Sequence, residues 1–189
     1  MFNLIFNSDI NLEIRAKIKR YFEKYKPFFK RYFPEMNNVD IYFAHEKKPS
    51  IIGKENELLM GVGYLVDNCA EIQIYDDNFT EADFVWLIFH ELNHVYRGFY
   101  ERDLWLMANI IPEGLALGFE KQIRKEINIQ WKDRSLYFNK NEKAMILKRL
   151  TEAIDICENK KDYDYNAWLY NFNGENPDFP HNLGYKIGD

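Results

Sequence analysis

The spacing of hydrophobic positions divides the chain into helix-like and strand-like stretches. Between residues 9 and 32, apolar side chains recur every three or four positions among lysines and arginines. This pattern predicts an amphipathic helix, which Pro27 should kink or shorten. Short runs at 39–44, 62–66 and 70–75 predict strands, and the last of them alternates cleanly between apolar and polar residues.

Helices dominate the chain after these strands. The Thr80 hydroxyl can cap the backbone N–H of Asp83, whose carboxylate can reach back, so a helix should begin here. Gly98 is a favourable residue to end it. A second helical stretch covers about 103–127, with an interruption at Pro112, which is expected to be the first residue of a fresh helix.

A further helix is expected at about 140–159, and the tail from residue 160 looks irregular until residue 183. Strands therefore precede most of the helices, which predicts the α+β class. We expect a small mixed or antiparallel sheet packed on the helix that begins at Thr80. With no repeat or linker in view, residues 1–189 should form one domain, with an N-terminal helix and a core from about residue 40.

Composition narrows the class of protein. The 189 residues are 47% hydrophobic, which indicates a globular chain, and the net charge of −5 lacks the basic footprint of a nucleic-acid binder. The first residues do not resemble a signal peptide, and no apolar run is long enough to span a bilayer. We therefore expect a cytoplasmic protein without a membrane partner, in which the basic residues of the first helix form a solvated face.

One short motif carries chemistry: His90-Glu91-Leu92-Asn93-His94. Histidines at i and i+4 lie one above the other on a helix, so both imidazoles can bind one Zn²⁺. Glu91 projects beside the metal, where its carboxylate can take a proton from metal-activated water. The motif therefore predicts a zinc hydrolase with His90 and His94 as ligands and Glu91 as the general base.

A catalytic zinc site needs a third protein ligand. Arg97 and Tyr100 exclude the extended motif that ends in a third histidine. Glu113 is the best candidate, because 19 residues after His94 allow the chain to turn and return as a second helix, and Gly114 and Ala116 permit its close approach. The other candidates are His45, Glu101, Asp103, Glu120 and His181.

The two helical motifs, His90–His94 and Glu113–Ala116, together resemble the gluzincin group of metallopeptidases. More narrowly, the chain resembles DUF2268, a bacterial family of predicted Zn-dependent proteases, over residues 40–188. The resemblance also rests on the strand at 70–75, on Trp168-Leu169 followed by a glycine, and on Gly184-Tyr185-Lys186-Ile187-Gly188. It implies a zincin-like fold, one Zn²⁺ per chain bound by His90, His94 and Glu113, and Glu91 as the catalytic base.

The expected function is hydrolysis of peptide bonds in a peptide or protein substrate. Tyr185 and His181 are candidate stabilisers of the oxyanion. An extended substrate is expected to add to the strand at 70–75 as an edge strand, contacting Ala70, Glu71, Ile72, Gln73, Ile74 and Tyr75. The alternatives are a regulatory zinc-binding protein of this fold and a hydrolase of non-peptide amides or esters.

Overall fold

The structure, a computed structural model, describes residues 2–46, 58–64, 68–98, 106–129, 140–159, 161–169 and 183–188. Its four strands are β1 (Phe2–Phe6), β2 (Val39–His45), β3 (Leu59–Tyr64) and β4 (Cys69–Ile74). They form one sheet in the order β1-β2-β4-β3, in which β1, β2 and β4 are parallel and β3 is antiparallel to β4. The sheet is thus mixed, as one of the two sequence expectations had it, and the antiparallel alternative is wrong.

The position of β4 in this sheet corrects the sequence analysis. β4 pairs with β2 on one side and with β3 on the other, so its backbone groups are used in both directions. The prediction of an edge strand that receives substrate at Ala70–Tyr75 is therefore wrong. Alternating polarity reports which face of a strand is buried, but it does not distinguish an edge strand from a central one.

One face of the sheet supplies part of the main core. Val39, Ile41 and Phe43 of β2 and Ala70, Ile72 and Ile74 of β4 are all buried. β1 was not predicted, because three of its five residues are half-buried and two are exposed, which resembles an irregular start. It pairs in parallel with β2, and a whole helix separates the two strands along the sequence. Such a long-range pairing leaves little local signal.

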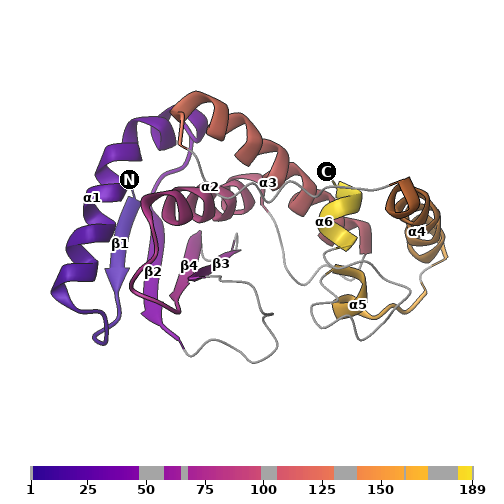
Figure 1. The fold of residues 1–189 in the computed structure, drawn as a ribbon, viewed down its shortest axis with the longest axis horizontal. Helices are drawn as coiled ribbons and strands as arrows, with labels where there is room; N and C mark the ends of the chain where they lie inside the picture. Colours follow the sequence, from indigo (N-terminus) through magenta and orange to yellow (C-terminus); the bar gives the residue numbers. More distant parts are fainter. Residues whose placement is uncertain are drawn as a thin grey trace.

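Two helices cover the buried face of the sheet (Figure 1). Helix α1 (Leu12–Tyr32) begins after its cap Asn11 and continues past Pro27, so Pro27 does not end it. Helix α2 (Glu81–Arg97) has the predicted capping box between Thr80 and Asp83, and Gly98 ends it with φ of 76°. Nearly every residue of α2 from Phe84 to Val95 is buried, which identifies it as the central helix of the fold.

Helix α3 (Leu106–Ile127) is continuous, and Pro112 lies inside it. The prediction of a fresh helix at Pro112 is therefore wrong. A proline within a helix removes one backbone hydrogen bond, and tertiary packing can offset that loss. Here Asn109 and Ile110 are buried before the proline and Glu113 and Gly114 after it, so both halves of the helix are anchored.

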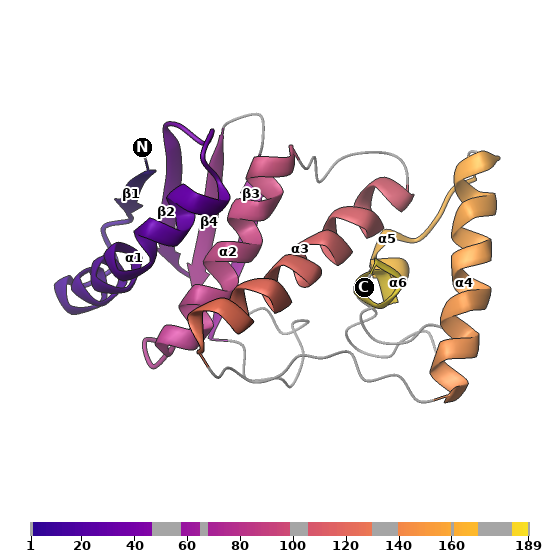
Figure 2. The ribbon, with the colours of Figure 1, turned by 90° about the horizontal axis from the view of Figure 1, so that it is seen from above.

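The last part of the chain forms a second layer of helices. Helix α4 (Lys140–Glu158) confirms the prediction for 140–159, α5 (Tyr165–Leu169) was not predicted, and α6 is Leu183–Gly188. They pack around a smaller apolar cluster that includes Leu106 and Ile110 of α3. Figure 2 shows α3 leading from the sheet layer to these helices. No helix in the described ranges is long and apolar enough to cross a membrane.

We expect Thr80→Ala to lower the free energy of unfolding by about 1 kcal/mol, because the backbone N–H of Asp83 loses its acceptor at the start of α2. Urea unfolding followed by circular dichroism measures the change. Thr151→Ala is a matched control, since the Thr151 hydroxyl only donates to the Leu147 carbonyl within α4. Equal losses in the two variants would contradict a specific capping role.

Candidate metal centre

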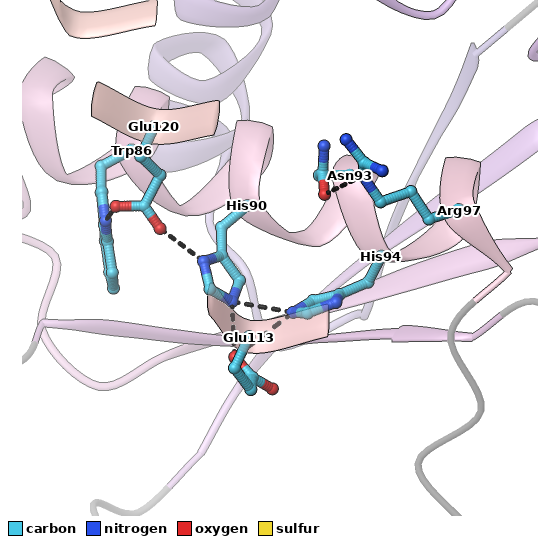
Figure 3. Close-up of polar contacts among 7 residues, drawn as sticks. All are labelled: Trp86, His90, Asn93, His94, Arg97, Glu113 and Glu120. Atoms are coloured by element: carbon cyan, nitrogen blue, oxygen red, sulfur yellow. Dashed lines mark hydrogen bonds and ion pairs between the residues drawn. The ribbon is translucent and has the colours of Figure 1, made fainter. Parts of the chain in front are cut away.

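The candidate site forms where α2 and α3 pack against each other (Figure 3). Trp86 contacts Glu120, His90 contacts both Glu120 and Glu113, and His94 contacts Glu113. Later residues of α2 thus meet earlier residues of α3, so the two helices run antiparallel. This is the return path that the sequence analysis expected for a third ligand at Glu113.

Three ligand-type atoms converge at this crossing. The Nε2 atoms of His90 and His94 lie 2.9 Å apart, and Glu113 Oε2 lies 3.2 Å from the first and 3.5 Å from the second. Tetrahedral zinc, with bonds of about 2.0–2.1 Å, holds neighbouring ligand atoms about 3.3 Å apart. The triangle therefore has the size that Zn²⁺ requires, and two imidazoles with one carboxylate are a donor set of catalytic zinc sites.

The outer nitrogen of His90 has its own partner. His90 Nδ1 and Trp86 Nε1 each contact one oxygen of the buried Glu120 carboxylate. With Nδ1 donating to this carboxylate oxygen, Nε2 is the nitrogen left for a metal. Such a carboxylate–histidine pair orients the ring and raises its basicity as a ligand.

The electrostatics of the cluster favour a cation at its centre. Burial alone lowers the pKa of His90, but hydrogen bonds to Glu113 and Glu120 outweigh it and hold that pKa well above its usual value. Burial alone raises the pKa of Glu113, yet hydrogen bonds with His90 and His94 hold it well below the usual range. A metal ion that binds between His90 and Glu113 must displace the proton of their hydrogen bond, so the affinity for the metal should rise with pH.

Glu91 lies beside the triangle and not within it. Its side chain is buried, and burial raises its pKa to about 7 against the opposing effect of His90 and His94. A carboxyl group with a pKa near neutrality is suited to accept and return a proton. Its side chain packs against the backbone of Gly61 in β3.

Among the other candidate ligands singled out in the sequence, the structure describes the side chains of His45 and Glu120, and neither belongs to the group of His90, His94 and Glu113. His45 ends β2, and its Nε2 lies 3.0 Å from Asp77 Oδ1. Glu120 contacts Nδ1 of His90, on the side of the ring away from the His90–His94–Glu113 group. Glu101, Asp103 and His181 lie outside the described residues, as does the side chain of Tyr185 in α6.

Sequence patterns did not single out Trp86 or Gly61 for this site, and they offered Glu120 only as an alternative third ligand behind Glu113. A signal for Glu120 was present, because it follows Glu113 by seven residues, or about two helical turns, and so shares its face. Trp86 likewise precedes His90 by four residues on α2. No local pattern points to Gly61.

Comparison with known proteins supports the same class. The model of the family DUF2268, described as a predicted Zn-dependent protease, matches residues 14–188. The match includes His90, Glu91, His94 and Glu113, and it begins within α1, earlier than the resemblance found in the sequence. No curated protein and no solved structure matches the chain.

Glu113→Gln should remove most of the bound zinc, because the neutral amide lacks the negative charge that offsets part of the charge of the divalent cation. Elemental analysis of the purified protein, after equilibration with one equivalent of zinc, measures the content per chain. The control is Glu126→Gln in the same helix, where the partly exposed carboxylate pairs with Arg31. Full zinc retention in Glu113→Gln would remove it from the ligand set.

Glu120→Gln should weaken zinc binding by roughly 10–100-fold while leaving three ligands in place, because His90 loses its charged outer partner. Competition with a chromophoric chelator measures the dissociation constant. Glu126→Gln again serves as the control. An unchanged dissociation constant in Glu120→Gln would mean that the carboxylate only stabilises the packing of α2 on α3.

Proposed function

The chain belongs to DUF2268, the family of predicted Zn-dependent proteases, and from this premise we propose that it is a zincin-like zinc metallopeptidase of the gluzincin type. The observation that carries the proposal is the triangle of His90, His94 and Glu113 with the buried Glu91 at its side. A purely structural zinc site has four protein ligands, whereas three ligands leave a position for water.

The residues divide the chemistry among them. His90, His94 and Glu113 would hold the ion, which when bound supplies Lewis-acid activation of water and of the substrate carbonyl. Glu91 accepts the proton of the attacking water and then passes it to the leaving amine. Burial favours the protonated form of the carboxyl group and so offsets part of the pKa-lowering effect of a neighbouring cation, which suits Glu91 to accept a proton and return it.

A peptide is the substrate that the strand order favours. β3 pairs with β4 and forms one edge of the sheet among the strands that the structure describes. The same strand passes directly beside Glu91 at Gly61. An extended chain added to β3 would therefore place its backbone carbonyls near the general base, in the manner of other peptide-binding sheet edges.

Glu91→Gln should retain about one zinc per chain, because the three proposed ligands are unchanged. It should lower kcat by roughly 10²–10⁴-fold, because the amide cannot accept the proton. Cleavage of a mixed peptide library, followed by mass spectrometry, measures turnover, with Glu126→Gln as the control. Unchanged turnover in Glu91→Gln would refute the mechanism.

Two other results would redirect the function. Zinc bound without cleavage of any peptide would favour a regulatory zinc-binding protein. Cleavage of model esters or small amides, but of no peptide, would favour a hydrolase of non-peptide substrates.

A further inference from the structure

The catalytic carboxylate and the edge strand are in unusually close contact. A Cβ atom placed on Gly61 would lie 2.5 Å from Glu91 Cγ, 2.8 Å from its Cδ and 2.8 Å from its Oε1. Carbon atoms that are not bonded to each other approach to about 3.5 Å. The Glu91 side chain therefore occupies the space that any side chain at position 61 would need.

Glu91 has little freedom to yield that space. It is only 4% exposed, so the side chain cannot swing into solvent. The closest atom is Cγ and not the far end of the side chain, so relief requires rotation about χ1. A helical residue has essentially two allowed χ1 wells, and a change of well would carry the carboxylate to a different place.

The sheet explains why Gly61 faces this helix. Gly61 pairs with Ile72 of β4, and Ile72 is buried on the face that α2 covers. Glycine within a strand weakens it, and its presence often marks a close approach of another group. Gly118 in α3 shows the contrast, because a Cβ atom there would meet nothing within 4 Å.

We propose that Gly61 is a positioning residue for the general base: its bare backbone is the wall that holds the Glu91 carboxylate beside the metal triangle. The contact itself needs no assumption about activity, whereas its catalytic consequence rests on the proposed peptidase function. Because the wall belongs to the edge strand, the base is held by the same element on which an extended substrate would lie.

A double-mutant cycle on thermal unfolding tests the contact. Gly61→Ala should lower the melting temperature by roughly 3–10 °C when Glu91 is present. The same substitution in the Glu91→Ala background should change it by less than about 2 °C, because the obstructing side chain is gone. Samples contain excess zinc, and Gly118→Ala controls for the glycine-to-alanine change. Equal losses in both backgrounds would overturn the proposal.

Turnover and zinc content test the consequence. Gly61→Ala should keep about one zinc per chain, leave KM within about threefold and lower kcat by roughly 10²-fold, as expected for a base displaced by about 1 Å. Full kcat in a folded, zinc-loaded Gly61→Ala variant would overturn the proposal. If Gly61→Ala does not fold, the proposal requires that the double variant with Glu91→Ala does fold, and an unfolded double variant would overturn it. A wild type without turnover would refute the peptidase while the unfolding cycle still decides the contact.

Discussion

The contacts of His90 with Glu113 and Glu120 tie α2 to α3 through buried charge. All three residues are less than 7% exposed, and ionisable groups at such depth are tolerated only when each has a partner. A shift of α3 by one residue along α2 would separate these partners and leave charges without compensation. The cluster therefore sets the register of the two helices as well as the site between them.

This register also determines how the two apolar clusters are joined. Ile123 of α3 belongs to the main core with the sheet, α1 and α2, whereas Leu106 and Ile110 belong to the smaller core with α4, α5 and α6. Glu113 lies between these two stretches of the same helix. The candidate metal centre is thus located where the C-terminal helices meet the sheet layer, and α3 runs through Pro112 as one continuous helix between the two clusters.

Sequence patterns predicted what depends on neighbours along the chain. The capping box of Thr80, the Gly98 terminus and the His90–His94 pair all result from helical geometry over a few residues, and the structure has each of them. Glu113 was selected because it follows His94 by 19 residues and because the small residues Gly114 and Ala116 permit a close approach of the second helix. The central place of β4, the strand β1 and the wall at Gly61 depend on pairings between distant segments, for which the chain carries no local signal.

The arrangement explains why neighbouring residues of one motif have different roles. Successive residues of a helix point about 100° apart, so His90 and His94 share one face of α2 while Glu91 projects from another. The first face meets α3, which supplies Glu113 and Glu120, and the second meets β3 at Gly61. Glu91 thus faces a different partner element from the two histidines, which fits its proposed role as a base and not as a ligand. A proposed base beside the metal triangle therefore requires that α2 pack against two different elements. One is the helix α3 and the other is the edge strand β3, and the two contact different faces of α2.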